Sequence, residues 1–355
     1  MTQENPVHRQ QAALAATLAD APSVAVLLPC YNEEAAIDQT VRDFQAALPN
    51  ARIYVYDNAS SDRTAAVARE AGAHVVSETL RGKGNVVRRM FADIEADIYV
   101  LSDGDDTYDA SAAEDLIELL CREQLDMVNA ARINTSDAAY RAGHKFGNRL
   151  FTGLVSNLFG KRFDDILSGY RVFSRRFVKS FPALAQGFEI ETELTVHALE
   201  LRMPVAEVPT AYKERPEGSE SKLNTFRDGF RILKTIVRLA KEERPLAFFS
   251  SGAMILALTS VGLSLPLFVT YFETGLVPRL PTAVLVCALM LLASLGFACG
   301  LILDSVSLSR RETKRLHYLT LPAPPLPTLP RTPRRSQPHR AESPAHKDVV
   351  HRAAI

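Results

Sequence analysis

Two long stretches near the end of the sequence contain no charged side chain, and they restrict the fold more than any other feature. They cover residues 245–272 and 280–303. Each exceeds the roughly 20 apolar residues that a helix needs to cross the hydrocarbon core of a membrane. Only the short segment Glu273–Arg279 joins them. We therefore expect a hairpin of two transmembrane helices over residues 245–305. The alternative is a helical hairpin buried inside a soluble protein.

Basic side chains flank this hairpin and predict its orientation. Arg238, Lys241 and Arg244 precede it, whereas the joining segment contains only Arg279. Four further basic residues follow it: Arg310, Arg311, Lys314 and Arg315. By the positive-inside rule, both termini and the large N-terminal part are expected in the cytoplasm. The chain would then be a multi-pass protein of the cell (inner) membrane.

The segments on either side of the hairpin have distinct compositions. In residues 225–241, apolar side chains at helical spacing oppose five basic ones, which are Arg227, Arg231, Lys234, Arg238 and Lys241. A basic amphipathic helix of this kind binds an anionic membrane surface, so we predict an interface helix at 223–244. The alternative is a surface helix packed on the core. Residues 306–355 are basic and rich in proline, which predicts a disordered cytoplasmic tail.

Short apolar runs alternate with helical patterns over residues 23–222. Strands are expected at 24–28, 52–56, 74–76, 98–101, 127–130 and 205–208, and helices at 33–48, 62–71, 84–94, 112–123, 140–159 and 189–201. This alternation is typical of an α/β fold with a Rossmann-like, mostly parallel sheet and right-handed crossovers. We assign residues 23–222 to this domain and residues 1–22 to an N-terminal tail.

Composition narrows the class of protein. The 355 residues carry no net charge, so nothing favours nucleic acid as a partner. The four cysteines, Cys30, Cys121, Cys287 and Cys299, have neither the spacing of a metal site nor that of a disulfide framework. The globular part is therefore expected in a reducing compartment, and no cleaved signal is expected.

An acidic turn follows the fourth expected strand. Asp103, Asp105 and Asp106 come directly after the apolar run, with Gly104 between the first two. Ligands of parallel sheets bind beyond the carboxyl ends of the strands, and closely spaced carboxylates there favour a hard cation. Mg²⁺ or Mn²⁺, held by one or two carboxylates and diphosphate oxygens, suits this pattern. We expect Gly104 to let the backbone approach a ligand. The alternative is a solvated acidic turn.

Polar turns also follow the first three strands. Their sequences are Leu28-Pro-Cys-Tyr-Asn-Glu-Glu34, Asp57-Asn-Ala-Ser-Ser-Asp-Arg-Thr64 and Arg81-Gly-Lys-Gly-Asn85. Asp57 could accept a hydrogen bond from a nucleobase or a ribose, while Asp62 fits a helix cap. Glycines and a lysine before a helix form an anion cradle. Together with the acidic turn, these motifs predict a site for a nucleotide diphosphate and a metal ion.

The motifs resemble those of a known family. Pro29-x-Tyr-Asn-Glu33, Asp57-Asn-x-Ser-x-Asp62, Gly82-Lys-Gly84 and Asp103-x-Asp105 are similar to motifs of family 2 inverting glycosyltransferases, which have the GT-A fold. Asp165-x-x-Ser-Gly-Tyr-Arg171 and a loop ending in Ser219-Glu-Ser-Lys222 resemble the polyprenyl-phosphate (dolichyl-phosphate) branch. The resemblance covers residues 23–305. It implies transfer of one sugar from a UDP- or GDP-linked donor to a membrane polyprenyl phosphate.

The resemblance also implies roles for individual residues. The nucleotide sugar would be bound by Pro29, Tyr31, Glu33, Asp57, Lys83, Asp103 and Asp105. Asp105, together with Asp103, would hold Mg²⁺ or Mn²⁺. Asp165 would act on the acceptor side as acid, base or orienting group, and Asp103 would orient the donor. Candidates for binding the acceptor phosphate are Arg171, Arg215 and Lys222. Glu191 matches the family's acidic helix position, unless it lies on a solvated face.

Some features depart from the family, and other functions fit part of the pattern. Asp103-Gly-Asp105 replaces the more usual Asp-Ala-Asp, and the proline-rich tail has no counterpart. A processive polysaccharide synthase would carry a Gln-x-x-Arg-Trp motif, but the chain has no tryptophan. A haloacid-dehalogenase-like phosphatase could use Asp103-x-Asp105, but there the motif normally follows the first strand. A non-catalytic nucleotide-sugar sensor and a homo-oligomer formed through the hairpins are compatible with the sequence.

Overall fold

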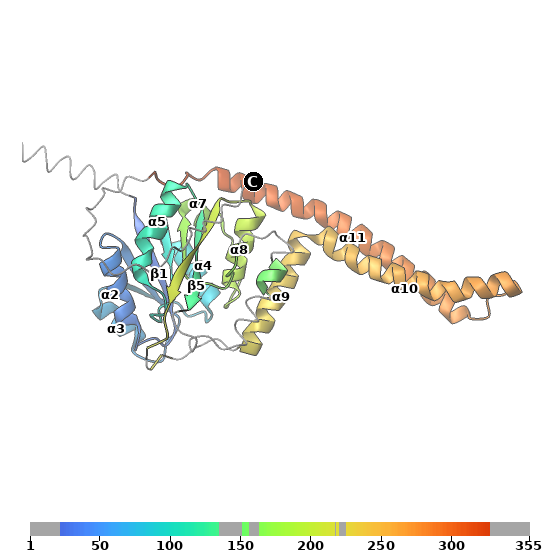
Figure 1. Cartoon of the computed structure of the whole chain (residues 1–355), viewed down its shortest axis with the longest axis horizontal. Coiled ribbons are helices and arrows are strands. Elements are labelled where there is room, and N and C mark those ends of the chain that lie inside the picture. The colour runs from blue at the N-terminus through green and yellow to red at the C-terminus, as the bar shows by residue number, and fades with distance from the viewer. Residues whose placement is uncertain (1–21, 135–150, 156–162, 217, 220–224, 327–355) are drawn as a thin grey trace, which may run out of the picture. The chain divides into compact units, whose positions relative to one another are not determined.

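The computed structural model describes residues 22–326, apart from 135–150, 156–162, 217 and 220–224 (Figure 1). The chain divides into two compact units. One comprises Met1–Gly229 together with His317–Ile355, and the other comprises Phe230–Leu316. The first unit contains the α/β fold that the alternating pattern predicts, and the second contains the apolar helices.

The first unit is built on one seven-stranded sheet with the order β3-β2-β1-β4-β6-β5-β7. The strands are β1 (Val24–Cys30), β2 (Arg52–Asp57), β3 (His74–Ser77), β4 (Ile98–Leu101), β5 (Met127–Asn134), β6 (Arg171–Ser174) and β7 (Val205–Tyr212). All neighbouring pairs are parallel except those of β6, which runs antiparallel to β4 and β5. The predicted mostly parallel sheet is therefore confirmed.

Helices connect these strands, most of them where the sequence predicts one. The predicted helices are α2 (Ile37–Ala47), α3 (Thr64–Glu70), α4 (Lys83–Asp93), α5 (Ala113–Arg122) and α8 (Ile190–Glu200). The short helix α7 (Arg175–Ser180) and the 3₁₀ helix η1 (Ala110–Ala112) were not predicted. The helix predicted at 140–159 lies largely outside the described residues. In α5 the buried residues Ala113, Leu116, Ile117 and Leu120 follow the helical repeat, so one face of the helix joins the core.

The sheet is buried on both faces, which explains the continuous apolar run of β1. Val26 and Leu28 belong to a core cluster that includes Phe44 of α2 and Leu116 of α5. A separate aromatic cluster packs Phe91 of α4 against other rings, namely Tyr99, Phe173 and Phe181. Helices that cover both faces exclude water from the strands, as in other parallel sheets.

Strand β6 was not expected from the sequence. It has only four residues, all of them buried, and Val172 lies opposite Val100 of β4 and Val128 of β5. Its strand propensity rests on Val172 and Phe173 alone, because Arg171 and Ser174 are polar. Tertiary pairing with β4 and β5, rather than local pattern, therefore determines this strand.

The second unit contains two helices that are long and apolar enough to cross a membrane. α10 (Pro245–Thr274) and α11 (Leu280–Leu319) have apolar windows with mean hydropathies of 2.0 and 2.5. Only 11 % of the residues in each window are buried, which does not fit the core helices of a soluble protein. Ser260 Oγ of α10 donates a hydrogen bond to Val286 O of α11 over 2.8 Å, so the two helices pack against each other.

Helix α9 (Thr225–Glu243) precedes α10, and its last turn is tied to α11. Arg310 donates to Glu242 O over 3.0 Å, and Arg311 donates to Glu243 O over 2.9 Å. These bonds satisfy carbonyl groups that the end of a helix leaves without intrahelical partners. The positive charge of the two arginines also interacts favourably with the negative end of the helix dipole. The basic residues after the hairpin thus stabilise the amphipathic helix.

Helix α11 continues beyond the predicted end of the hairpin at residue 305. Residues 306–319 are helical, so this part of the predicted disordered tail is corrected. Within the first unit, Tyr318 Oη donates to Asp126 Oδ2 over 2.7 Å, and the Arg176 guanidinium lies 4.9 Å from the centre of the Tyr318 ring. Residues 327–355 lie outside the described part.

Candidate active site

The register of the sheet brings the predicted motifs to one edge. Cys30 at the end of β1 lies opposite Asp57 at the end of β2, which in turn lies opposite Ser77 at the end of β3. Leu101, at the end of β4, pairs with Leu27 of β1. Parallel strands place their carboxyl ends together, so the turns after all four strands meet where such sheets bind ligands.

Lys83 connects two acidic side chains at this edge. Its Nζ lies 2.5 Å from Asp103 Oδ1 and 2.5 Å from Glu191 Oε1. Desolvation alone would lower the pKa of Lys83, but the charges of Asp103 and Glu191 outweigh it and raise the pKa above its usual range. Desolvation would likewise raise the pKa of Asp103, yet Lys83 holds it below its usual value. The Glu191 side chain is buried, so it does not lie on a solvated face.

Asp105 is paired with a residue from the loop after β7. The side chain of Asp105 is buried, and its Oδ2 forms an ion pair with Arg215. Thr107 donates to the other oxygen through its hydroxyl, over 2.6 Å. Desolvation and the neighbouring charge of Asp103 raise the pKa of Asp105 despite Arg215. The acidic pair is thus balanced by two cationic side chains, Lys83 and Arg215.

The same loop contacts Glu33 in the turn after β1. Arg215 Nη1 lies 3.6 Å from Glu33 Oε1, and Ser219 Oγ donates to Glu33 Oε2 over 2.7 Å. Residues 213–216 and 218–219 of the first unit therefore lie beside the predicted donor site. Lys222, the remaining candidate from this loop, lies outside the described residues.

Gly104 is required by a neighbouring side chain. A Cβ atom added at Gly104 would lie 2.3 Å from Cys30 Sγ and 3.4 Å from Ile37 Cδ1. Cys30 is buried, so its sulfur cannot move out into solvent. Close packing with Cys30 therefore accounts for a glycine between the two aspartates, and the expected approach of the backbone to a ligand stays a prediction.

The donor set fits a hard divalent cation. Asp103 and Asp105 supply carboxylate oxygens, which such ions prefer. No group of three or more His, Cys, Asp or Glu side chains in the described part of the chain is arranged to hold a metal ion. Oxygens of a diphosphate and water would therefore complete the coordination shell, and Arg215 would have to leave Asp105 Oδ2.

The predicted base-binding region contains a buried acceptor without a partner. Asp57 Oδ2 accepts from Ser60 N over 3.3 Å, whereas Asp57 Oδ1 has no hydrogen-bond partner among the described residues. Such an orphaned oxygen is costly unless a ligand donates to it. Nearby, the Arg81 guanidinium lies 5.4 Å from the centre of the Tyr31 ring. Pro29 is the last residue but one of β1.

Asn58 organises the loop beside this region, a role that the motif analysis did not assign. Its Nδ2 donates to Glu78 O and Leu80 O over 3.1 and 2.8 Å, and its Oδ1 accepts from Gly82 N over 2.7 Å. The side chain thereby fixes the backbone that leads to Lys83. The Asp-Asn dipeptide was visible in the sequence, but its distant backbone partners were not.

Asp165 is held by Arg132, a residue that the sequence did not single out. Arg132 donates from Nε and Nη2 to the two carboxylate oxygens over 2.7 and 2.8 Å. Desolvation would raise the pKa of Asp165, but the charge of Arg132 and hydrogen bonds keep it below its usual value. Asp165 is therefore ionised at neutral pH.

Arg171 requires a correction. Its side chain is 0 % exposed and donates to Ser168 O, Ile166 O and Thr195 Oγ1 over 3.0, 2.7 and 2.9 Å. The enclosed guanidinium thus holds together the backbone of the turn before β6 by binding two of its carbonyl oxygens. Its burial leaves no access for a lipid phosphate, which contradicts the predicted role in acceptor binding.

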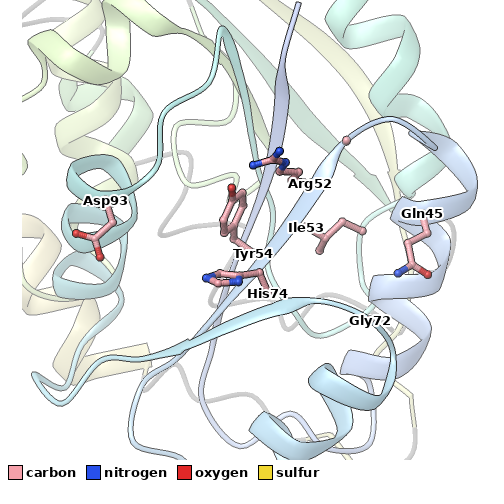
Figure 2. Close-up of a pocket in the computed structure, with 8 residues that line it drawn as sticks. Gln45, Arg52, Ile53, Tyr54, Gly72, His74 and Asp93 are labelled. Carbon is pink, nitrogen blue, oxygen red and sulfur yellow. The ribbon is translucent and has the colours of Figure 1, made fainter. Parts of the chain in front are cut away.

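A separate cavity of about 650 Å³ lies near the start of β2 and β3. Figure 2 shows Tyr54 and His74 next to each other in this cavity, with Asp93 of α4 beyond them. None of the predicted site residues lines it. The cavity is therefore distinct from the acidic edge of the sheet.

Comparison with protein families agrees with this geometry. Residues 25–181 match the family described as glycosyl transferase family 2. Glycosyltransferase AglJ of Haloferax volcanii is 33 % identical over 300 residues, which cover 84 % of this chain and 98 % of that protein. A dolichyl-phosphate hexose transferase of the same organism is 29 % identical over 221 residues, covering 62 % of this chain and 95 % of that protein.

A solved structure shares the fold. Glucosyl-3-phosphoglycerate synthase from Mycobacterium tuberculosis, in complex with Mn²⁺, uridine diphosphate and glucosyl-3-phosphoglycerate, aligns with a TM-score of 0.52 and 24 % identity. The alignment covers 65 % of this chain and 82 % of that chain. The chain therefore belongs to glycosyl transferase family 2 and is a glycosyltransferase with the GT-A fold.

Proposed function

We propose that the protein transfers a single sugar, with inversion, from a nucleotide sugar to a membrane polyprenyl phosphate in the presence of Mg²⁺ or Mn²⁺. The observation that carries the proposal is the Asp103–Asp105 pair at the end of β4, balanced by Lys83 and Arg215. Family membership favours this chemistry over the phosphatase alternative. The name of the dolichyl-phosphate hexose transferase relative supports the lipid acceptor.

The donor would bind along the edge formed by β1, β2 and β4. Asp57 Oδ1 would accept a hydrogen bond from the base, which both uracil and guanine can supply through a ring N–H. Tyr31, beside Arg81, would pack on the base, with Pro29 and Glu33 lining the same turn. Lys83 would keep Asp103 ionised and oriented toward the sugar. UDP- and GDP-linked donors are both compatible with these contacts.

The diphosphate would leave as the anomeric bond breaks. A divalent cation held by Asp105 and Asp103 would offset the negative charge that develops on this leaving group. Arg215 would then exchange its contact with Asp105 for an oxygen of the acceptor phosphate. This exchange keeps the guanidinium paired throughout, which matters because an unpaired charge in a half-buried site is costly.

The acceptor phosphate is already an anion, so a strong general base is not required. Asp165, whose pKa is held low, is suited to orienting rather than deprotonating. Because it holds Arg132 through two charge-assisted hydrogen bonds, it would present that guanidinium to the incoming phosphate. Arg215 and Lys222 would supply further positive charge. The lipid tail would remain in the bilayer beside the predicted membrane spans.

The placement in the cell is a further part of the proposal, and the distribution of basic residues around the two apolar helices supports it. The spans α10 and α11 would cross the inner membrane, with both termini and the catalytic unit on the cytoplasmic side, where nucleotide sugars are available. On α9 the exposed apolar residues Phe230, Leu233 and Val237 share one face, which suits a helix lying in the membrane surface.

The test is an assay on the purified full-length protein in detergent. Polyprenyl phosphate, Mg²⁺ or Mn²⁺ and a panel of UDP- and GDP-sugars are supplied, and lipid-linked product is separated by chromatography. One donor is expected to give a glycolipid whose anomeric configuration is opposite to that of the donor. Chelation of the metal should stop the reaction. If no donor in the panel yields a glycolipid, the proposal is wrong.

A further inference from the structure

Glu207 of β7 binds the backbone N–H groups of Asp164 and Asp165. Its Oε2 accepts from Asp164 N over 2.7 Å, and its Oε1 accepts from Asp165 N over 3.1 Å. Asn129 Nδ2 of β5 donates to the same Oε1 over 2.7 Å and to Asp165 O over 2.8 Å. Both peptide groups of Asp165 are therefore fixed by side chains from the two strands.

The pairing of β5 with β7 makes this arrangement possible. Asn129 and Glu207 lie opposite each other in the parallel register, so their side chains reach the same turn. Arg132, three residues after Asn129 on β5, holds the carboxylate of Asp165. The backbone and the side chain of Asp165 are thus fixed independently, by Glu207 with Asn129 and by Arg132.

A carboxylate is the side chain that this turn needs. Three N–H groups converge on Glu207, and an ionised carboxylate is the side chain that accepts through both oxygens and donates nothing. An amide would direct its own NH₂ at one of these donors. Burial raises the pKa of Glu207, so an ionised group at this position is costly without the hydrogen bonds it accepts. The hydrogen bonds from the turn and from Asn129 offset this cost, so Glu207 and the turn fix each other's position.

We infer that Glu207 is a positioning residue for sugar transfer, acting on the acceptor side through Asp165 and Arg132. The inference rests on the proposed function, in which Asp165 orients Arg132 toward the acceptor phosphate. Loss of Glu207 would release the backbone N–H groups of Asp164 and Asp165 and allow the turn to shift. Displacement of a reacting group by about 1 Å can lower a rate by about 100-fold.

The test uses Glu207→Ala and Glu207→Gln in the full-length enzyme. Glu207→Ala is expected to lower kcat/KM for polyprenyl phosphate by about 10- to 100-fold, and Glu207→Gln, which keeps one acceptor oxygen, by less. The affinity for nucleoside diphosphate with Mn²⁺ should stay within about twofold, because the donor motifs lie on other strands. A general folding defect would reduce both quantities and the melting temperature together.

A matched control removes a carboxylate that holds a backbone N–H far from the site. Asp97 Oδ2 accepts from Ser23 N and Ser23 Oγ over 2.9 and 2.7 Å before the start of β4. Asp97→Asn is expected to leave the kinetic constants for the acceptor unchanged. If it lowers kcat/KM for the acceptor as much as Glu207→Ala does, the effect is not specific to the turn and the inference fails.

A double variant decides whether Glu207 acts through Asp165. Residues that act as a unit show strongly non-additive losses, so Glu207→Ala should lower activity little further once Asp165→Asn is present. If the fold-loss of activity in the double variant equals the product of the two single fold-losses, the inference is overturned. Wild-type enzyme that makes no glycolipid would overturn the proposed function as well. An active wild type whose Glu207 variants keep their acceptor constants would overturn the inference alone.

Discussion

At the scale of single residues, Asp105 carries the charge on which the proposed chemistry depends most. Asp105→Asn keeps the shape of the side chain but removes its negative charge, so binding of the divalent cation should weaken strongly. We expect metal-dependent turnover to fall by about 100-fold or more, in line with the loss of other electrostatic contacts to developing charge. The measurement is glycolipid formation as a function of Mn²⁺ concentration.

The adjacent aspartate provides the control for this variant. Asp106 Oδ1 lies 3.6 Å from Lys213 Nζ. The residue has a φ of 54°, a backbone conformation that asparagine tolerates. Asp106→Asn should therefore preserve both the fold of the turn and the turnover. Equal activity of Asp105→Asn and the wild type would remove the proposed role of Asp105.

The contact between Gly104 and Cys30 predicts how a substitution at Gly104 changes the stability of the protein. Gly104→Ala would place its Cβ 2.3 Å from Cys30 Sγ, so the variant should lower the free energy of unfolding by about 1–3 kcal/mol. The double variant Cys30→Ala/Gly104→Ala removes the sulfur and should regain most of this loss. Both can be measured by chemical unfolding of the purified protein.

Gly153→Ala serves as the comparison, because a Cβ there meets nothing within 4 Å. It should not destabilise the protein. If Gly104→Ala is as stable as Gly153→Ala, close packing with Cys30 does not explain the glycine.

Individual site residues differed in how well the sequence predicted them. Lys83, Asp103 and Asp105 were recognisable because each lies in a short motif that follows the carboxyl end of a strand and leads to the next helix, so its position in the sequence places it near the sheet edge. Arg132 and Glu207 lie inside strands and act on a turn that is distant in sequence. Their roles follow from the pairing of β5 with β7, which no local pattern encodes.

At the scale of elements, the helices α2 to α5 and the strands β1 to β5 were predicted from apolar repeats and apolar runs in the sequence. β6 was not, because its two apolar residues lie between the polar Arg171 and Ser174, whereas the equally short β4 is an unbroken apolar run. The end of α11 was also unexpected. A helix ending was predicted near the membrane boundary, but continued helical spacing through residues 306–319 and contacts of Tyr318 in the first unit extend it.

The contact of Tyr318 with Asp126 can be tested directly. Tyr318→Phe keeps the ring beside Arg176 but removes a hydrogen bond to a buried carboxylate, which is worth about 1.5–3 kcal/mol. We expect protease to cleave near the end of α11 faster in this variant. The neighbouring His317 is exposed and lies 3.2 Å from Lys179 O, so His317→Ala should change the cleavage rate little. Equal cleavage rates for both variants would contradict a stabilising role of Tyr318.

At the scale of the whole molecule, the prediction concerns the membrane. The full-length protein should sediment with membranes and resist extraction by high salt, because α10 and α11 are apolar and largely exposed. A chain that ends at residue 326 retains both spans and should behave in the same way. Deletion of residues 245–355 should release the catalytic unit, unless α9 holds it at the surface. A full-length protein found in the soluble fraction after cell lysis would contradict the two spans.

Hydropathy predicted the two long apolar helices well because a run of uncharged residues is a local property. The division of the chain was less predictable. The second unit runs from Phe230 to Leu316, and the residues after it return to the first unit. That return depends on side chains such as Tyr318 that fit a distant surface, and composition alone gave no indication of it.

The ion pair between Arg215 and Asp105 has a consequence for how the two substrates influence each other. One guanidinium cannot neutralise Asp105 and a phosphate at the same time, so the two anions compete for it. Under the proposed function, a lipid that draws Arg215 away would expose Asp105 to the divalent cation and strengthen its binding. By thermodynamic reciprocity, the donor complex would enhance lipid affinity to the same extent. A change of partner by one arginine would then couple binding of the water-soluble donor to binding of the lipid acceptor.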